Sequence, residues 1–176
     1  LDLEDEAALL AACGSMRRRV AALAPRAEID GFTVQAMARR PEAHELIVGA
    51  ALDPVFGPVV LFGQGGLAVE ALADHAVALP PLNQVLARDL VSRARVSRLL
   101  LGYRNRPAAD HDAIYAVLIA VGQLLADIPE IVSLDINPLL ADRHGVLALD
   151  ARIEIAAGQA SGVQRFAVLP YPQHLE

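Results

Sequence analysis

The chain contains no lysine and no tryptophan, and it has one cysteine among its 176 residues. All 15 basic residues are arginines, so the chain offers no amine for a Schiff base and no ammonium group for a phosphate. The single Cys13 excludes an internal disulfide, which agrees with a reducing compartment, and its helical surroundings predict that it packs in a core. These absences argue against amine chemistry and redox chemistry.

No apolar run approaches the roughly 20 residues that a bilayer-spanning helix needs, and the first residues are acidic, unlike a signal peptide. We therefore expect a cytoplasmic protein with no membrane partner. The net charge of −6 and the pI near 5.3 argue against a nucleic-acid partner, because no basic field is available to displace counterions. Aromatic residues make up only 4%, so alanine, leucine and valine must form the core of a medium-sized domain.

Hydrophobic periodicity predicts both helices and strands. Residues 3–23 have apolar positions at helical spacing and acidic residues in the first turn, and residues 111–127 have the pattern of a buried helix with Asp110 as its N-cap. Residues 81–103 predict one or two further helices. Extended segments are predicted at 32–37, 44–52 and 58–62, which form a meander, and at 75–79. Residues 67–74 fit a short helix or a continued strand.

Residues 133–154 predict a β-hairpin that gathers polar groups on one face. If the turn is centred between Arg143 and His144, Asn137 lies opposite Asp150. The other pairs in this register are Asp135 with Arg152, Ser133 with Glu154, Ile136 with Ala151, Leu134 with Ile153, and Pro138 with Leu149. One face of the hairpin is therefore apolar and the other carries oxygen ligands.

The Asn137–Asp150 pair has two interpretations. A carboxylate and a carboxamide on neighbouring strands, with Cβ atoms roughly 5 Å apart, provide half of a coordination shell for Mg²⁺, which prefers oxygen and completes its shell with waters and phosphates. Alternatively, this is an ordinary solvated face of a sheet, with a surface ion pair between Asp135 and Arg152.

Four motifs in order carry a family resemblance: GFTVQAM, HELIVGAALDPVFGPVVLFGQGGLAVEALAD, LLGYRNRPAAD and DINPLLADRHGVLALDARI. Together they resemble the C-terminal half of the ATP-grasp domain in ADP-forming acyl-CoA synthetases, such as the ADP-forming acetate–CoA ligases, and are similar to the nucleotide-binding subunit of succinyl-CoA synthetase. The resemblance covers residues 1–155 and leaves 156–176 as a linker toward a possible downstream domain. It implies an α/β fold, an ATP-grasp half-domain with a mixed, largely antiparallel sheet flanked by helices.

The resemblance implies a ligase that converts an acid, CoA and ATP into acyl-CoA, ADP and phosphate through an acyl phosphate and a phosphohistidine. It implies ATP or ADP and Mg²⁺ as cofactors, with Mg²⁺ bound at Asn137 and Asp150, while another domain binds CoA. The implied partners are the N-terminal ATP-grasp lobe and the CoA-binding ligase domain of the same protein or complex. A homo-oligomer is also possible.

The same resemblance implies a set of nucleotide-binding residues: Gln35, Met37, Glu45, Asp53, Gly63, Gly65, Gly66 and Arg104. Each also has a purely structural interpretation. Gln35 and Met37 fit an ordinary strand, Glu45 fits an exposed strand position, and the glycines fit tight turns. Arg104 departs from the family pattern, because Asn105 follows it where relatives have glycine, and Ser133 stands where relatives often have an acid.

The family's phosphate-binding lysine and glycine-rich lid belong to the preceding lobe, and its catalytic histidine belongs to a separate domain. None of the five histidines falls in a matching motif, so we expect each to lie at the surface or in a turn. We therefore predict no catalytic residue and no synthetase activity for this chain alone. Residues 165–176, RFAVLPYPQHLE, resemble the link to an acetyltransferase domain in some bacterial relatives, so a regulatory synthetase-like region of a protein lysine acetyltransferase is the alternative.

Overall fold

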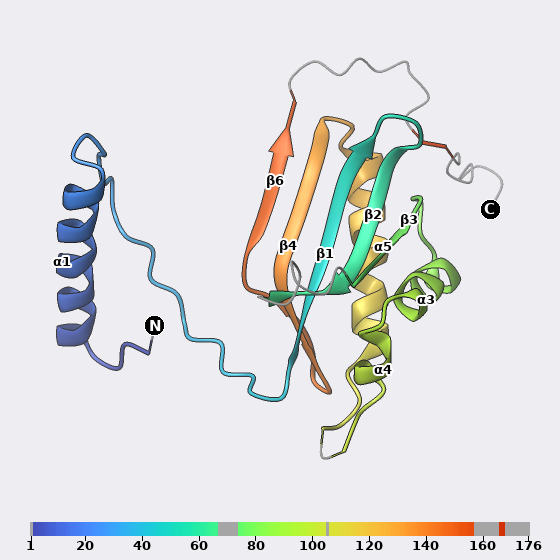
Figure 1. Ribbon diagram of the computed structural model, residues 1–176, viewed down its shortest axis with the longest axis horizontal. Helices are drawn as coiled ribbons and strands as arrows, with labels where there is room; N and C mark the ends of the chain where they lie inside the picture. The colour runs from blue at the N-terminus through green and yellow to red at the C-terminus, as the bar shows by residue number, and fades with distance from the viewer. Residues whose placement is uncertain (1, 67–73, 105, 157–165, 168–176) are drawn as a thin grey trace. The chain divides into compact units, whose positions relative to one another are not determined.

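The computed structural model describes residues 2–66, 74–104, 106–156 and 166–167 (Figure 1). It divides the chain into two compact units, Leu1–Arg39 and Arg40–Glu176. Within the described residues, no helix combines the length and the apolar character that crossing a membrane requires. Residues 67–73 lie outside the described ranges, and so does almost all of the predicted linker. The residues predicted to form one site are thus divided between two units.

Helix α1, Glu6–Leu23, is the regular element of the first unit. Asp5 caps its N-terminus by accepting a hydrogen bond of 2.7 Å from the Ala8 N–H, which satisfies a donor that the helix itself leaves free. The predicted helix is thus confirmed. No residue of α1 is buried, and Cys13 is only half-buried. The prediction that Cys13 packs in a core is wrong within this unit, because one helix cannot enclose a side chain.

The strand predicted at residues 32–37 does not form. A strand needs a hydrogen-bonded neighbour, and both edges of β1 (His44–Asp53) are already occupied, one by β2 (Gly57–Gln64) and the other by β4 (Ile131–Asp142). The prediction was therefore wrong because alternation of side chains does not supply a partner strand. The meander consists of β1, β2 and β3 (His75–Ala78) instead.

The second unit contains one sheet in which every strand pair is antiparallel. The strand order is β3-β2-β1-β4-β5, and β6 (Ala151–Ile155) also pairs with β4, beyond the end of β5 (Gly145–Ala148). The predicted fold class, an α/β half-domain with a largely antiparallel sheet flanked by helices, is confirmed.

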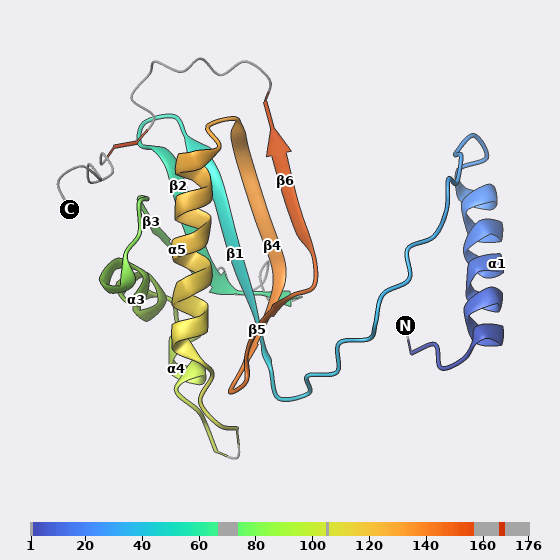
Figure 2. The same cartoon turned by 180° about the vertical axis from the view of Figure 1, so that it is seen from behind.

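Helices cover one face of this sheet: α5 (His111–Asp127) runs along the strands behind the sheet in Figure 1 and in front of it in Figure 2, beside α3 (Gln84–Arg93) and α4 (Ser97–Leu100). The region 81–103 thus contains two helices. Asp110 caps α5, as predicted, by accepting a 3.0 Å hydrogen bond from Ala113 N–H. The core between the helices and the sheet includes alternate strand residues and one stripe of α5: Leu46, Val48, Ala50, Val60, Phe62, Ile114, Leu118 and Leu125. The other face of the sheet is not covered by any described helix of this unit.

The predicted hairpin forms in the predicted register. Asp142 pairs with Gly145 at the turn, and Ser133, Leu134, Asp135 and Ile136 pair with Glu154, Ile153, Arg152 and Ala151. The apolar face of the hairpin is only partly buried, because β6 is an edge strand whose residues are all exposed.

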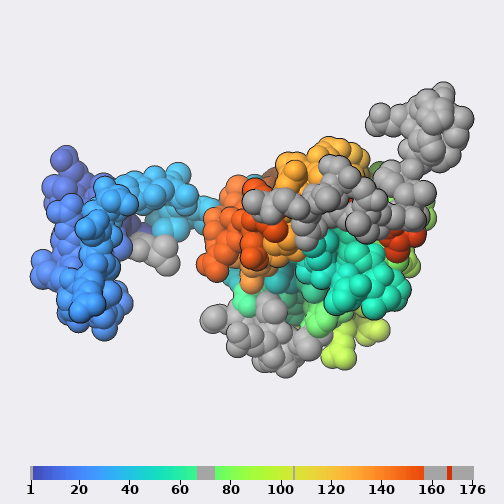
Figure 3. Space-filling view, turned by 90° about the horizontal axis from the view of Figure 1, so that it is seen from above, coloured from blue at the N-terminus to red at the C-terminus, as the bar shows by residue number. Residues whose placement is uncertain are grey.

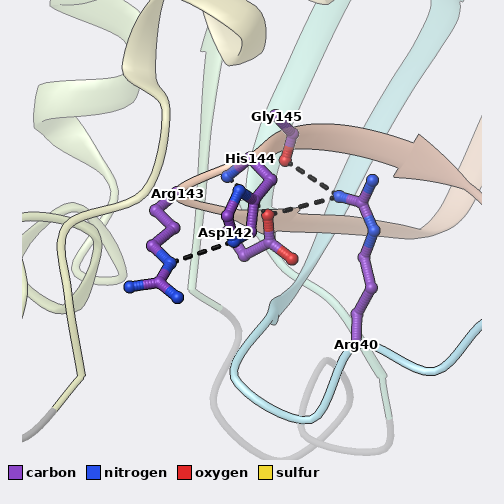
Figure 4. Close-up of polar contacts among 5 residues, drawn as sticks. All are labelled: Arg40, Asp142, Arg143, His144 and Gly145. Carbon is purple, nitrogen blue, oxygen red and sulfur yellow. Dashed lines mark hydrogen bonds and ion pairs between the residues drawn. The ribbon is translucent and has the colours of Figure 1, made fainter.

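Buried Asp142 holds the turn of this hairpin together (Figure 4). Its carboxylate accepts a hydrogen bond of 2.8 Å from His144 N–H and lies 3.4 Å from the Arg40 guanidinium. Arg40 also donates to the Gly145 carbonyl at 3.2 Å, and Arg143 donates to His144 Nε2 at 3.0 Å. These contacts attach the first residue of the second unit to the hairpin and stabilise the register that places Asn137 opposite Asp150.

Candidate nucleotide-binding site

Asn137 and Asp150 face each other across the hairpin. The Asn137 N–H donates to the Asp150 carbonyl at 3.3 Å, and the next residues in register, Leu149 and Pro138, are joined by a hydrogen bond of 3.1 Å. The register of β4 against β1 shifts between Ile136 and Leu139, so strand alternation does not fix the direction of Asn137. Its Oδ1 accepts a hydrogen bond from the Gly66 N–H, and Gly66 lies against the Glu45 carboxylate on the face without helices. The backbone hydrogen bonds thus place the two residues opposite each other, in the register that the sequence predicts.

The predicted ion pair of Arg152 differs from the one observed. Arg152 is paired in register with Asp135, but its Nε lies 3.3 Å from the carboxylate of Asp150, which directly precedes β6. Both side chains of this ion pair are more than half exposed, so the pair is weak and can be exchanged for another cation. Asp150 thus already has a cationic neighbour.

A glycine turn connects the end of β2 to Asn137. The Gly65 N–H donates to the Glu45 carbonyl at 2.8 Å, and the Gly66 N–H donates to Asn137 Oδ1 at 3.3 Å. The structure thus brings four predicted residues together at one end of the sheet: Glu45, Gly65, Gly66 and Asn137. Asp150 joins them through its pairing with Asn137.

Glycine is required in this turn because the chain passes very close to its neighbours. A Cβ on Gly65 would overlap the backbone of Leu46, and one on Gly63 would overlap the carbonyl of Asp74. Gly66 has a φ of +71°, and a Cβ there would meet the carboxylate of Glu45. Close approach to the backbones of Asp74 and Leu46 thus accounts for Gly63 and Gly65. Gly63 lies within β2 and not in a tight turn.

Asp53 lies at the opposite end of β1. Eight residues separate it from Glu45, which corresponds to about 27 Å along an antiparallel strand. Its carboxylate accepts hydrogen bonds from the N–H groups of Val55 and Phe56 at 2.8 and 2.9 Å, and these bonds, Phe56 first, hold the pKa of Asp53 below its ordinary value. The β1–β2 turn lies at the surface (teal in Figure 3), with Val55 81% exposed. The structure therefore does not bring Asp53 to the other predicted residues.

Gln35 and Met37 belong to the first unit and lie in an irregular segment in which both side chains are exposed. The strand predicted for these two residues does not form. Arg104 has a φ of +55°, and its guanidinium stacks over the ring of Tyr103 at 5.2 Å from the ring centroid. Arg104 makes no contact with the glycine turn among the contacts of the described residues.

A cavity of about 460 Å³ lies beside the glycine turn, on the side of the sheet that the helices cover. Its lining comprises Ala43, His44, Glu45, Gln64, Gly65, Val96, Leu99, Tyr103 and Arg106. Mutual backbone hydrogen bonds between Tyr103 and Arg106 close the loop that contributes both residues. The resemblance implies Arg104 as a nucleotide-binding residue. In the structure Arg104 stacks over Tyr103, and Arg106 lines the cavity.

His44 departs from the prediction that each histidine lies at the surface or in a turn. It begins β1 opposite fully buried Ala141, and its Nε2 is buried without a hydrogen-bond partner within the described part of the chain. Burial lowers the pKa of His44 below its ordinary value of 6.5, and the positive charge of Arg106 lowers that pKa further. The imidazole is therefore neutral at pH 7. The alternation of β1, with Leu46 and Val48 inward, places His44 inward as well.

The donor set of Asn137 and Asp150 fits Mg²⁺. Both side chains offer hard oxygen atoms, and Mg²⁺ sites commonly use one or two carboxylates with waters and substrate phosphates. No cluster of three or more His, Cys, Asp or Glu side chains suited to a metal occurs among the described residues. The pair thus offers two oxygen ligands of the kind that Mg²⁺ binds.

Comparison with known proteins agrees with this geometry. The chain matches the ATP-grasp domain family over residues 1–155. It is 38% identical over 129 residues to acetate–CoA ligase (ADP-forming) I of Archaeoglobus fulgidus, which covers 73% of this chain and 18% of the relative. It is 34% identical over 129 residues to acetate–CoA ligase (ADP-forming) I subunit beta of Pyrococcus furiosus, which covers 73% of this chain and 55% of the relative. The chain thus spans about half the length of the subunit beta relative and less than a fifth of the length of the Archaeoglobus fulgidus ligase.

Solved structures of Ca. Korarchaeum cryptofilum dinucleotide forming acetyl-coenzyme A synthetase 1 share the fold. One, in complex with coenzyme A, acetyl-coenzyme A and a phosphorylated phosphohistidine segment, has a TM-score of 0.82 and 34% identity, over 89% of this chain and 69% of that chain. Another, in complex with coenzyme A and Mg-AMPPCP, has a TM-score of 0.63 and 36% identity, over 66% of this chain and 55% of that chain. The predicted resemblance is thus confirmed: the chain belongs to the ATP-grasp domain family, and its relatives are ADP-forming acyl-CoA synthetases.

Proposed function

We propose that this chain is the nucleotide-binding lobe of a cytoplasmic ADP-forming acyl-CoA synthetase, in which Asn137 and Asp150 bind Mg²⁺ with ATP or ADP. The observation that carries the proposal is the pairing of these two residues across the hairpin, next to the glycine turn. Family membership and similarity to ADP-forming ligases support the same function.

The proposed role of this chain's residues is to bind Mg²⁺ with the nucleotide phosphates and to orient the side chains that hold the metal. Asn137 and Asp150 would hold Mg²⁺, whose bound charge neutralises nucleotide phosphates. The Gly66 N–H orients the Asn137 side chain, because it donates to the amide oxygen and so leaves the second lone pair of that oxygen available. Arg152 neutralises Asp150 in the absence of Mg²⁺. The glycine turn thus prepares one ligand, while an exposed ion pair holds the other.

The remaining parts of the reaction are proposed to lie outside this chain. The chain spans only 55% of the subunit beta relative and 18% of the longer ligase, so the N-terminal ATP-grasp lobe and the CoA-binding ligase domain are proposed as its partners. A solved relative is in complex with coenzyme A, which supports CoA binding in the family, and we propose that another domain binds it. Conversion of an acid, CoA and ATP into acyl-CoA, ADP and phosphate is thus proposed for the whole assembly.

Calorimetric titration of the chain with ADP, with and without Mg²⁺, tests the metal assignment. We expect Mg²⁺ to increase the affinity for ADP, and we expect Asp150→Asn to reduce the Mg²⁺-dependent affinity about 10-fold, as expected for the loss of one charged ligand. Asp127→Asn is a matched control, because Asp127 is an exposed residue at the C-terminal end of α5. Equal Mg²⁺-dependent affinities for the wild type and Asp150→Asn would remove the assignment.

The chain by itself is proposed to be catalytically inactive. It contains no lysine to bind phosphate, and it spans only 55% of the subunit beta relative. The purified chain should give no CoA-dependent release of ADP from ATP with a short carboxylic acid. Turnover under these conditions would contradict the proposal.

A regulatory role remains the alternative proposal, in a synthetase-like region joined to a protein lysine acetyltransferase. Its support is the resemblance of residues 165–176 to such a link, and nearly all of these residues lie outside the described ranges. In a catalytic protein Asp150→Asn should abolish acyl-CoA synthesis by the whole assembly. In a regulatory protein the same variant should change acetyltransfer to a lysine substrate.

A further inference from the structure

The cavity beside the glycine turn is distinct from the Asn137–Asp150 pair. Asn137 lies on the face without helices, whereas Val96, Leu99 and Tyr103 bound the cavity on the helix-covered side. A volume of about 460 Å³ falls within the range of sites for small molecules. The cavity therefore has the size of a second binding site.

Two polar groups of this cavity lack partners in the described part of the chain. His44 Nε2 is buried without a hydrogen bond, and burying a polar nitrogen in this way costs free energy. The Arg106 guanidinium takes part in no ion pair within the described ranges. Both groups line the same cavity, so a single ligand could satisfy them together.

The chemistry of these groups favours an anion. A guanidinium binds oxyanions through a planar fork of donors, and a neutral imidazole presents one N–H donor. The carboxylate of Glu45 also borders the cavity, but it lies against Gly66 on the other face of β1, where a Cβ on Gly66 would meet it. The donors and the carboxylate thus occupy different sides of the strand.

We propose that this cavity is an oxyanion-binding site, in which the Arg106 guanidinium and the Nε2–H of His44 bind one phosphoryl or carboxylate group. Gln64 and Tyr103 supply further polar atoms at the rim, and Val96 and Leu99 contact the apolar part of the ligand. The site does not require the Mg²⁺ assignment, because neither Asn137 nor Asp150 lines the cavity.

The test is a titration of the chain with inorganic phosphate and, separately, with acetate, in the absence of nucleotide and of Mg²⁺. The readout is the ring nitrogen resonances of His44 in long-range ¹H–¹⁵N spectra, assigned with His44→Gln. We expect a saturable shift with at least one of the two anions. A response to phosphate alone identifies a phosphoryl site, and a response to acetate alone identifies a carboxylate site.

Variants that remove a positive or a negative charge should change the affinity for the anion in opposite directions. Arg106→Gln should weaken anion binding about 10-fold, whereas Glu45→Gln should strengthen it, because the nearby negative charge is removed. Arg104→Gln is the matched control: it removes the same charge from the same loop, but Arg104 stacks on Tyr103 outside the cavity lining, so affinity should change about 2-fold or less through screened charge.

Three results would overturn the oxyanion site: no shift of the His44 signals with either anion, equal affinities for the wild type and Arg106→Gln, or weaker binding by Glu45→Gln. Arg106 is exposed, so its replacement should leave the fold intact and the comparison interpretable. Loss of ADP binding in Asp150→Asn with an unchanged phosphate response would separate this site from the nucleotide site.

Discussion

At the Glu45 end of β1 the chain crosses from β2 over β1 to reach Asn137 on β4, whereas at the Asp53 end it turns back within a single hairpin. Both ends contain glycine and an acidic residue in a family motif. At the Glu45 end, groups from separate strands and from the 103–106 loop converge. At the Asp53 end, the carboxylate bonds only to the turn that follows it. The comparison shows that groups from distant segments come together where the chain crosses between strands, whereas a local turn gathers only the groups next to it.

The largest expected difference between the two ends of β1 is in the free energy of unfolding that is lost when a core leucine is truncated. Leu46 is fully buried at the Glu45 end, and Leu52 is half-buried at the Asp53 end. We expect Leu46→Ala to lower the free energy of unfolding by about 3 kcal/mol and Leu52→Ala by about 1 kcal/mol, because the former leaves an unfilled cavity. Urea denaturation with equal m-values measures both. Equal losses would show that the two ends are packed alike.

The next largest expected difference is in the cost of replacing a glycine at each end of β1 with alanine. Gly65→Ala forces a methyl group against the backbone of Leu46 and should cost about 2 kcal/mol. Gly57→Ala, at a φ of +73° in the β1–β2 turn, adds only backbone strain and should cost about 1 kcal/mol. Thermal or urea unfolding gives both values. A larger loss for Gly57→Ala would contradict the close crossing of the chain at Gly65.

The two ends of β1 should also differ in their effect on the affinity for ADP. Asn137→Ala removes the proposed amide ligand and should weaken Mg²⁺-dependent binding of ADP about 10-fold. Asp53→Ala should leave that affinity unchanged, because Asp53 lies about 20 Å along β1 from Ile47, the residue nearest to Asn137 in the β1–β4 register. Calorimetry on both variants measures the difference. A loss in Asp53→Ala as large as that in Asn137→Ala would show that the two ends act together in the assembled site.

The smallest expected effect is on the pH dependence of stability. Burial and the charge of Arg106 lower the pKa of His44 in the folded chain, so the unfolded chain binds a proton first as the pH falls below 6.5. Stability should therefore decrease through this window. His44→Gln should flatten the decrease, and His75→Gln, at an exposed position of β3, should not. Arg106→Gln should also flatten the decrease, because the charge of Arg106 contributes to the lowered pKa of His44. Tyr103 and Glu45 are the other ionisable groups that line this cavity.

The other end of β1 should respond in a separate pH window. Hydrogen bonds from Phe56 and Val55 lower the pKa of Asp53 in the folded chain. Its contribution to stability is therefore present above the ordinary value of 3.8 and is lost as the pH falls through the lowered folded value. Asp53→Asn should remove a loss of stability below pH 3.8 and should leave the window near pH 6 unchanged, as acid unfolding monitored by circular dichroism would show.

Local patterns predicted much of this architecture. The spacing of apolar residues predicted α1 and α5, and Asp110 was identified as a cap, because capping depends on the few residues around it. The hairpin register followed from a turn with Asp142 and Gly145 at its ends, since each pair is then set by residue number alone. The pairing of Asn137 with Asp150 was therefore predictable before any coordinates were known.

Other features depend on contacts between distant segments. Residues 32–37 alternate like a strand, but both edges of β1 are taken by β2 and β4. Arg104 and Arg106 cannot be distinguished in the motif, because the closure of their loop decides which side chain lines the cavity. His44 reads as a surface residue until its register with buried Ala141 is known.

By itself, the sequence determined the elements that arise from neighbouring residues: two capped helices, a hairpin and its register, and through them the pairing of an amide residue with a carboxylate residue. Only the tertiary structure decided which glycine turn reaches that pair, which acidic motif lies far from it, and which arginine and histidine share a cavity. The physical reason is range: capping and turn hydrogen bonds act over a few residues, whereas close approach and burial depend on where the rest of the chain packs.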